Sequence, residues 1–369
     1  MKNKKSKLQL AQEKTELIIK QTNDKINQLG ENTDNLYISL EKINEVFNNI
    51  RNVPEEFILK YKEINTIRLN WKNQVEEIES KYKKAEVKQA GKGAAGVGAG
   101  VAVAAMGPTA AMGIATTFGV ASTGTAISAL SGAAATNAAL AWLGGGALAT
   151  GGGGMTAGSA LIGMAGPIGW AIAGVSAIAS GILFFRTKVN KEKLEKIFIN
   201  ISNRDIKSYE LSIIELNERI KRIINETKVL NNAIKKINTF GKDYKKMTEE
   251  QEYELGAYYN LMEASTMLLV NPILGLQQKF SDNDFKMFLK TQSETVKEKL
   301  KKNKNMILYL TNLLYKIELD EKDKKLLHKL LRKDEEFLKT IKMNKEDFKL
   351  GCLTTVQEAL NFRYINNEY

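Results

Sequence analysis

The sequence predicts an all-α protein in which long antiparallel helices, packed like a coiled coil, flank a hydrophobic helical hairpin rich in glycine and alanine. Apolar residues in both charged parts of the chain recur at alternating spacings of three and four, which is the period of a helix packed along one seam. Between these parts, residues 93–185 contain no Asp, Glu, Lys, Arg or His and hold 22 of the 28 glycines. No segment alternates with period two for long enough to predict a strand.

This pattern divides the chain into an N-terminal helical arm (1–92), an uncharged membrane hairpin (93–185) and a C-terminal helical arm (186–369). The arms carry the whole net charge of +12, divided as +4 and +8. Acidic residues are interleaved with the basic ones throughout both arms, and no nucleic-acid-binding motif is present, so we expect no nucleic-acid partner. An anionic lipid surface accounts for the positive charge, because each basic residue near such a surface contributes about 1 kcal/mol.

The N-terminal arm predicts two helices, over about 5–51 and 54–90. Pro54 followed by Glu55 and Glu56 suits a helix start, since proline fits the first turn and acids favour the positive end of the helix dipole. Gly30 is expected to interrupt the first helix. The second carries the apolar seam Ile64, Ile67, Trp71, Val75, Ile78 and Tyr82.

The C-terminal arm opens with a heptad seam in which Thr227 is the one polar member. Gly241 is a natural helix stop, Thr248 and Gln251 form a capping-box pattern for the next helix, and Pro272 should end that helix. Further helices are expected over about 284–318 and 321–343, with a short segment after Asn344. The apolar members of the seam are Ile213, Leu216, Ile220, Ile223, Leu230, Ile234 and Ile237.

These seams fit packing within one chain or coiled-coil assembly between chains, and the sequence leaves both open. Helices that begin and end next to one hydrophobic insert should pack antiparallel, because the insert brings its own ends together.

The uncharged segment is long enough to cross a membrane more than once, since one helical crossing needs about 20 residues. The best candidate span is Ser159–Phe185, and a second lies within Thr109–Leu143. The glycine-rich stretch between them should form the turn, because each glycine costs a helix about 1 kcal/mol relative to alanine. The side chains expected to enter the membrane are Leu161, Ile162, Ile168, Trp170, Ile172, Val175, Ile178, Ile182, Leu183, Phe184, Phe185 and Trp142.

Basic residues expected at the membrane surface flank both ends of this segment. Both ends should therefore remain on one side, which predicts an even number of crossings, two or four. The residues concerned are Lys83, Lys84, Lys88, Lys92, Arg186 and Lys188.

Small side chains dominate the segment, which gives little insertion energy but allows close helix packing. The pairs Gly96 and Gly100, and Gly154 and Gly158, are G-x-x-x-G patterns of this kind. We therefore expect a homo-oligomer or a related helical partner. Hydroxyls such as those of Thr116 and Thr117 can line a wet lumen or bond neighbouring carbonyls, and both interpretations remain open.

Two other interpretations of the whole segment are a glycine-rich disordered stretch and a permanently buried core. The regular aliphatic content after Ser159 argues against disorder. A resting state that shelters the hairpin between the arms is compatible with later insertion.

The residues required for catalysis are scarce, so we predict that the protein is not an enzyme and uses no cofactor or metal. The chain has one histidine, His328, and one cysteine, Cys352, and contains no P-loop. The G-x-G-x-x-G match at 91–96 follows a charged helix rather than a strand, and we discard it as a dinucleotide site. No apolar signal segment follows the basic N-terminus, so we expect synthesis in the cytoplasm without a secretory signal, followed by membrane association from a pool that can be soluble.

Two stretches carry a resemblance: Ala115–Gly146, ATTFGVASTGTAISALSGAAATNAALAWLGGG, and Ala165–Gly174, AGPIGWAIAG. They resemble a glycine-rich hydrophobic membrane module of uncharacterised bacterial proteins. The plan of long helices around one hydrophobic hairpin is similar in architecture to α-helical pore-forming toxins of the cytolysin A and Bacillus enterotoxin type. This resemblance implies a soluble form that inserts and oligomerises.

Two hypotheses follow for the function. The first is an oligomerising, pore-forming effector, acting as a toxin or in self-directed defence. The second is a coiled-coil scaffold or tether that is anchored in the membrane from its synthesis.

Overall fold

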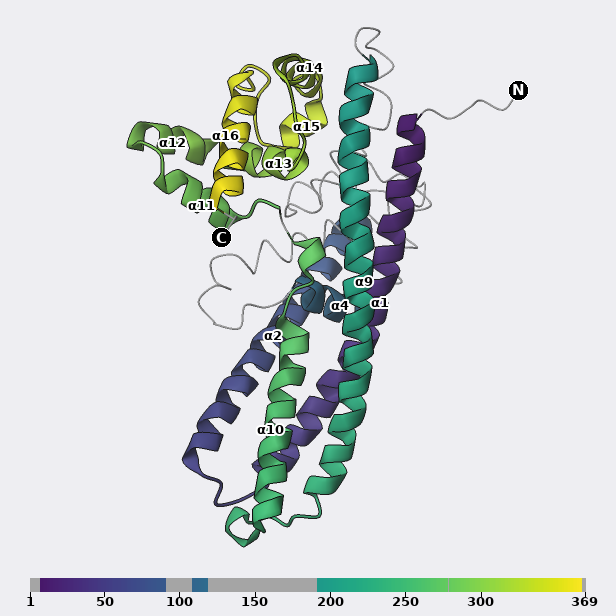
Figure 1. The fold of residues 1–369 in the computed structure, drawn as a ribbon, viewed down its shortest axis with the longest axis vertical. Coiled ribbons are helices and arrows are strands. Elements are labelled where there is room, and N and C mark those ends of the chain that lie inside the picture. Colours follow the sequence, from purple (N-terminus) through teal and green to yellow (C-terminus); the bar gives the residue numbers. More distant parts are fainter. Residues whose placement is uncertain (1–6, 91–107, 119–190, 278, 367–369) are drawn as a thin grey trace, which may run out of the picture.

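The computed structural model describes residues 7–90, 108–118, 191–277 and 279–366, and these residues contain helices and no strand, which confirms the all-α prediction (Figure 1). The two helices predicted over about 5–51 and 54–90 are observed as the first two helices of the chain, within three residues of their expected bounds. The five elements of the long bundle are α1 (Lys7–Asn48), α2 (Glu55–Ala90), α4 (Pro108–Phe118), α9 (Lys191–Ile237) and α10 (Glu249–Val270).

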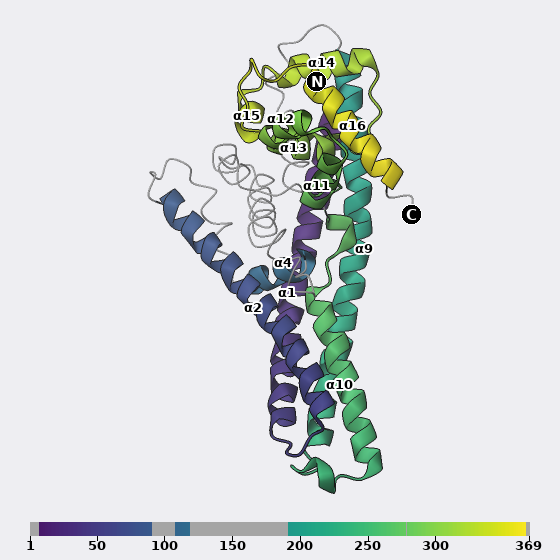
Figure 2. The same cartoon turned by 90° about the vertical axis from the view of Figure 1, so that its left-hand side faces the viewer.

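The bundle consists of two helical hairpins, α1–α2 and α9–α10, lying side by side (Figures 1 and 2). The two helices of each hairpin run antiparallel. The helices that flank the uncharged segment, α2 and α9, also run in opposite directions, but α9 packs mainly against α1 and not against α2 as expected. The two longest helices, α1 and α9, run parallel. Residues later in α1 pair with residues later in α9: Ser39 bonds to Asn231, and Asn52, just past α1, bonds to Asp243, just past α9, at nearly constant separations of 192 and 191 residues. Each arm thus folds back on itself, and the two arms then pack in the same direction.

The predicted seams form the core of this bundle. On α9, Leu216, Ile223, Leu230 and Ile237 are fully buried. The seam of α2 is buried from Ile64 to Ile78, whereas the side chain of Tyr82 lies outside the described residues. Apart from Ile64 and Ile213, the described apolar residues of both seams belong to one cluster with the buried face of α1, so packing within the chain accounts for them.

Local signals place the turns where the sequence predicted them. Gly241 adopts a φ of +87°, a conformation that favours glycine, just after α9 ends. The capping box is present, since the Thr248 hydroxyl accepts from the backbone of Gln251 and the Gln251 side chain accepts from the backbone of Thr248. Helix α10 ends at Val270, before Pro272. Each of these three predictions is confirmed.

The C-terminal residues form a smaller cluster of short helices, which we call the head (Figure 2). The long helix expected over 284–318 is wrong, because Ser281 and Ser293 each start a new helix and Thr291 and Asn303 end the first two. The segment after Asn344 includes a 16-residue helix. The head comprises α11 (Asp282–Lys290), α12 (Glu294–Lys302), α13 (Lys304–Leu314), α14 (Glu321–Leu331), α15 (Glu335–Thr340) and α16 (Gly351–Asn366).

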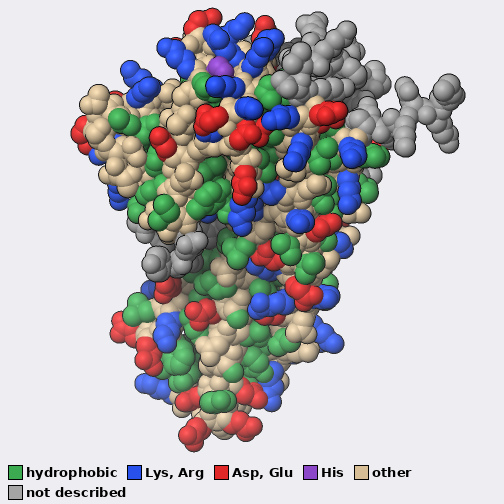
Figure 3. Space-filling model, turned by 45° about the horizontal axis from the view of Figure 1, so that its top comes forward, with side chains coloured by type: hydrophobic (Ala, Val, Ile, Leu, Met, Phe, Trp, Pro, Cys, Tyr) green, Lys and Arg blue, Asp and Glu red, His purple; other side chains and the backbone are tan. Residues whose placement is uncertain are grey.

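The head is joined to the upper part of the bundle through apolar contacts. Leu8 of α1 and Leu194, Phe198 and Ile201 of α9 belong to the same buried cluster as the head helices. Basic and acidic side chains are intermixed over the head and the bundle on the face drawn in Figure 3. The described arms therefore present a solvated surface of mixed charge around two apolar cores.

The seam of α9 provides a direct test of this packing. Leu230 is fully buried and Leu211 is 65% exposed on the same helix. We expect Leu230→Ala to lower the free energy of unfolding by about 2–5 kcal/mol, because a core leucine leaves a cavity. Leu211→Ala should change it by less than about 0.5 kcal/mol. Urea denaturation measures both values, and equal effects would contradict the assignment of the seam.

Candidate functional site

Most residues predicted to act at the membrane lie outside the part of the chain that the structure describes. This holds for all twelve predicted membrane-inserting residues, for the four glycines of the G-x-x-x-G pairs, and for Lys92, Arg186 and Lys188. Lys83, Lys84 and Lys88 belong to the last turns of α2, but their side chains are not described. Their membrane roles therefore remain predictions.

The start of the second candidate span is described, and it is buried. Helix α4 covers its first residues, with Pro108 in the first turn, where proline fits best. It packs against α1, α2 and α10, in the angle that opens where α2 leans away from the other helices (Figures 1 and 2). Ile114 and Ala115 are at most 1% exposed and join the main core. This part of the uncharged segment is thus enclosed by the charged arms.

Glycine allows α4 to approach the backbone of α1. A Cβ atom placed on Gly30 would lie 1.8 Å from the carbonyl oxygen of Thr109, and one on Gly113 would lie 2.1 Å from that of Ile26. No side chain fits at such distances, so the two helices touch backbone to backbone. The prediction that Gly30 interrupts the first helix is wrong: α1 continues through it, and the missing side chain serves the crossing.

The last turn of α4 contains polar groups with and without partners among the described residues. The carbonyl oxygen of Thr117 accepts from the backbone of Ile273 at 2.7 Å. The hydroxyls of Thr116 and Thr117 are buried and make no hydrogen bond to any described residue. For these two hydroxyls the carbonyl interpretation is not met among the described residues, whereas the lumen interpretation concerns the inserted state and stays a prediction. Since a buried unsatisfied polar group costs about 1–3 kcal/mol, α4 fits its position closely in shape but at a cost in hydrogen bonding.

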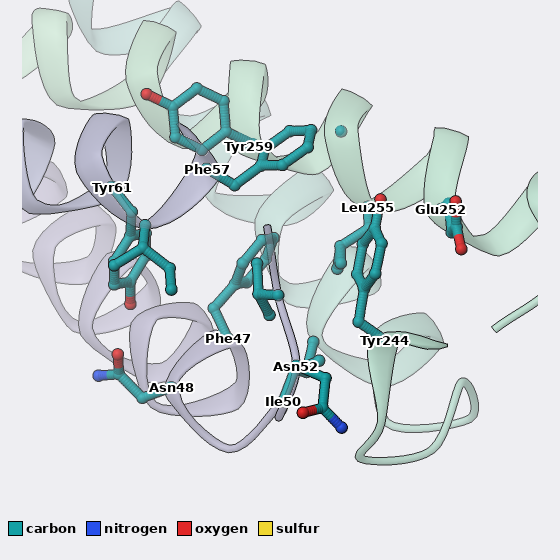
Figure 4. A pocket seen from close by; sticks show the side chains of 13 residues that line it. Phe47, Asn48, Ile50, Asn52, Phe57, Tyr61, Tyr244, Glu252, Leu255 and Tyr259 are labelled. Atoms are coloured by element: carbon teal, nitrogen blue, oxygen red, sulfur yellow. The ribbon is translucent and has the colours of Figure 1, made fainter. Parts of the chain in front are cut away.

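A pocket of about 450 Å³ lies at the other end of the bundle, where the α1–α2 turn meets the start of α10 (Figure 4). Its aromatic side chains are Phe47, Phe57, Tyr61, Tyr244 and Tyr259. The Phe57 ring is 6.5 Å from both the Tyr244 and Tyr259 rings, measured between centroids. The pocket was not predicted from the sequence, because residues of both arms have to come together to form it. The aromatic residues near both turns were the signal that could have indicated it.

A second, more polar groove of about 830 Å³ lies between the upper part of α9 and the segment after α13. Arg204 donates to Asp205 and to the carbonyl oxygens of Leu313 and Tyr315. Burial raises the pKa of Asp205, although Arg204 beside it acts in the opposite direction. The groove is lined by more bases than acids, namely Lys193, Lys196, Arg204, Lys207, Lys279 and Lys316 against Glu318, Asp320 and Asp323.

Within the described ranges, no group of His, Cys, Asp and Glu side chains could hold a metal ion. His328 lies on α14, where its Nε2 is 2.8 Å from the carbonyl oxygen of Phe348 and its ring stacks on that residue. Burial raises the pKa of the Cys352 thiol. His328 and Cys352 are both part of the packing of the head.

No family model, curated protein or solved structure matches the chain. Among the helices that the structure describes, none is both long and apolar enough to span a bilayer.

The contact between α1 and α4 predicts opposite effects for two glycine substitutions. Gly30→Ala should lower the free energy of unfolding by about 1–3 kcal/mol, because the new methyl group overlaps the Thr109 carbonyl. Gly256→Ala, within α10, meets no atom within 4 Å and should raise it by up to about 1 kcal/mol through helix propensity. Thermal or urea unfolding gives the comparison, and a neutral Gly30→Ala would show that α4 does not press on α1.

Proposed function

We propose that the protein is a membrane-inserting, oligomerising effector that forms pores, and that its helical arms hold part of the uncharged segment, residues 108–118, before insertion. The observation that carries the proposal is the burial of α4, the one described piece of that segment, between α1, α2 and α10. The segment continues without a single ionisable residue to Phe185. Its length and composition support a later position in lipid.

The composition of α4 supports the proposal that this helix can leave the bundle. The helix is made of small and moderately apolar residues, so its burial stabilises the bundle less than a leucine-rich helix of equal length would. The hydroxyls of Thr116 and Thr117, which make no hydrogen bond to the described residues, reduce this stabilisation further. Release of α4 would break its contacts with α1, α2 and α10 but would leave the packing of α1 against α9 in place.

The charge of the arms supports approach to an anionic bilayer. The net charge of +12 lies wholly outside the uncharged segment. The groove beside α9 adds a local excess of lysine and arginine. Electrostatic attraction concentrates the protein at the surface, and insertion then draws on the apolar hairpin and on packing between copies through small residues.

Release of dye from anionic liposomes tests the proposal, and Gly30→Val sharpens the test. This variant should unseat α4 and speed dye release about tenfold if docking weakens by about 1.4 kcal/mol. Leu353→Ala is the matched control, since it removes a fully buried side chain from the head cluster, which contains no residue of α4. Similar acceleration by both variants would attribute release to general instability, and no release from any form would reject pore formation.

A second test addresses the main candidate span. Ile172→Arg and Ile178→Arg should each block stable insertion, because a charge at the centre of a membrane helix costs about 2.5–3.5 kcal/mol. Flotation of the protein with liposomes, after a high-salt wash, measures insertion apart from surface attraction. Unchanged flotation of both variants would refute the placement of this span.

The alternative of a constitutive membrane anchor predicts a different distribution in cells. Carbonate extraction of expressing cells should yield a soluble pool if the arms shelter the hairpin before insertion. Exclusive residence in the membrane, together with intact liposomes after addition of purified protein, would favour the scaffold or tether instead.

A further inference from the structure

The pocket at the lower end of the bundle is built by both hairpins. Phe47 lies in the last turn of α1, and Phe57 and Tyr61 lie in the first two turns of α2. Tyr244 comes from the turn before α10, and Tyr259 from α10 itself. Figure 4 shows these aromatic side chains arranged around one cavity, with Glu252 beside Tyr244 at one side. A molecule bound here would contact the N-terminal and the C-terminal arm together.

The rings present several faces and edges toward this cavity. Phe57 and Tyr259 are nearly perpendicular, at 76°, whereas Phe47 and Tyr61 are stacked with centroids 6.0 Å apart. Burial raises the pKa of Tyr61 to about 12, so its hydroxyl is neutral at physiological pH. That hydroxyl also donates to the carbonyl oxygen of Asn44, which fixes the orientation of the ring.

The charge of the lining is opposite in sign to that of the whole protein. The lining contains no lysine or arginine, and Glu252 is its one acidic residue. Burial first, and then the charges of Glu252 and Glu56 together with a hydrogen bond to Glu252, raise the pKa of Tyr244. The lining therefore combines five aromatic rings with one carboxylate, in a chain of net charge +12.

The guanidinium of Arg68, which lies near Tyr61, bonds to residues outside the pocket lining. Arg68 is only 2% exposed and donates to the carbonyl oxygen of Leu40 and to Oδ1 of Asn44. It is not among the lining residues. Its guanidinium is used to hold α2 against α1.

From this geometry we infer that the pocket binds an organic cation that carries a methylated ammonium group, such as choline. Such a cation is attracted to the faces of aromatic rings, and its methyl groups fill apolar space that a hydrated ammonium or metal ion would leave empty. Glu252 supplies the opposite charge, whereas an anionic ligand would meet no base. The volume of about 450 Å³ suits a small ligand.

This inference goes beyond the proposed membrane insertion and does not depend on it. A bound cation would bridge the two hairpins far from α4, and it would stabilise the closed bundle in proportion to its occupancy. Binding can be measured on the full chain in the absence of any membrane. Failure of the pocket therefore leaves the membrane proposal standing, and the reverse is also true.

Titration of the full-length protein with choline and with 3,3-dimethylbutan-1-ol tests the inference. The second compound has the shape of choline but no charge. Calorimetry or ligand-observed NMR should show choline binding at least about tenfold tighter than the neutral compound, and choline should raise the melting temperature. Equal binding of the two compounds, or no binding of choline, would overturn the assignment.

Two variants locate the site. Glu252→Gln should weaken choline binding about tenfold, whereas Glu250→Gln removes the same charge from the same helix end at an exposed residue outside the pocket and should leave the affinity unchanged. Phe57→Leu keeps an apolar lining but removes a ring, and it should weaken choline more than the neutral compound. Equal effects of the two glutamate variants would contradict the site.

The cation can be free or part of a lipid headgroup, and vesicles separate these sources. If phosphatidylcholine vesicles displace bound choline and phosphatidylglycerol vesicles do not, the headgroup is the ligand. If neither displaces it, the ligand is the free cation, and the site is supported in both cases. Displacement by phosphatidylglycerol alone would contradict a cation site.

Discussion

The backbone contact between α1 and α4 is the constraint on which the arrangement depends. Gly30 and Gly113 bring the two helices closer than any side chain permits, because Cβ atoms there would lie 1.8 and 2.1 Å from carbonyl oxygens. This contact places a piece of the uncharged segment within the charged arms. Dispersion and burial hold it there, whereas the hydroxyls of Thr116 and Thr117 weaken the fit. Residues 108–118 of the uncharged segment are therefore enclosed in the bundle and only moderately stabilised.

The contact between α1 and α4 lies within a bundle whose two longest helices, α1 and α9, pack parallel. Helices α1 and α9 both begin at the end of the bundle that carries the head. The α1–α2 and α9–α10 turns meet at the opposite end, where the backbone of Arg51 bonds to the backbones of Lys242 and Tyr244. Helix α2 then leans away from the bundle, and α4 lies in the resulting angle (Figure 2). The two ends have different chemistry: the upper end carries the basic groove, and the lower end carries the aromatic pocket with Glu252. The proposed attraction to an anionic surface draws on the basic groove, and the separate inference of a ligand site concerns the aromatic pocket.

The sequence predicted those features that depend on local periodicity or on caps. The seams of α2 and α9, the capping box of Thr248 and Gln251, and the turn at Gly241 are all observed. It failed where tertiary contacts decide the outcome. Gly30 has low helix propensity, yet the close crossing with α4 explains its place on the buried face of α1. Neither Ser293 nor Asn303 makes a side-chain capping hydrogen bond, so no strong local signal marked the division of 284–318 into three helices. The burial of α4 depends on partners from both arms.

The position of Ile114 before and after the protein meets a bilayer tests the central claim most directly. Ile114 is 1% exposed on α4, so a cysteine there, introduced by Ile114→Cys together with Cys352→Ser, should resist a water-soluble maleimide. The account predicts that a lipid-anchored maleimide modifies this cysteine when anionic liposomes begin to leak. Continued protection of the cysteine, at a protein concentration that empties the liposomes, would contradict the release of α4.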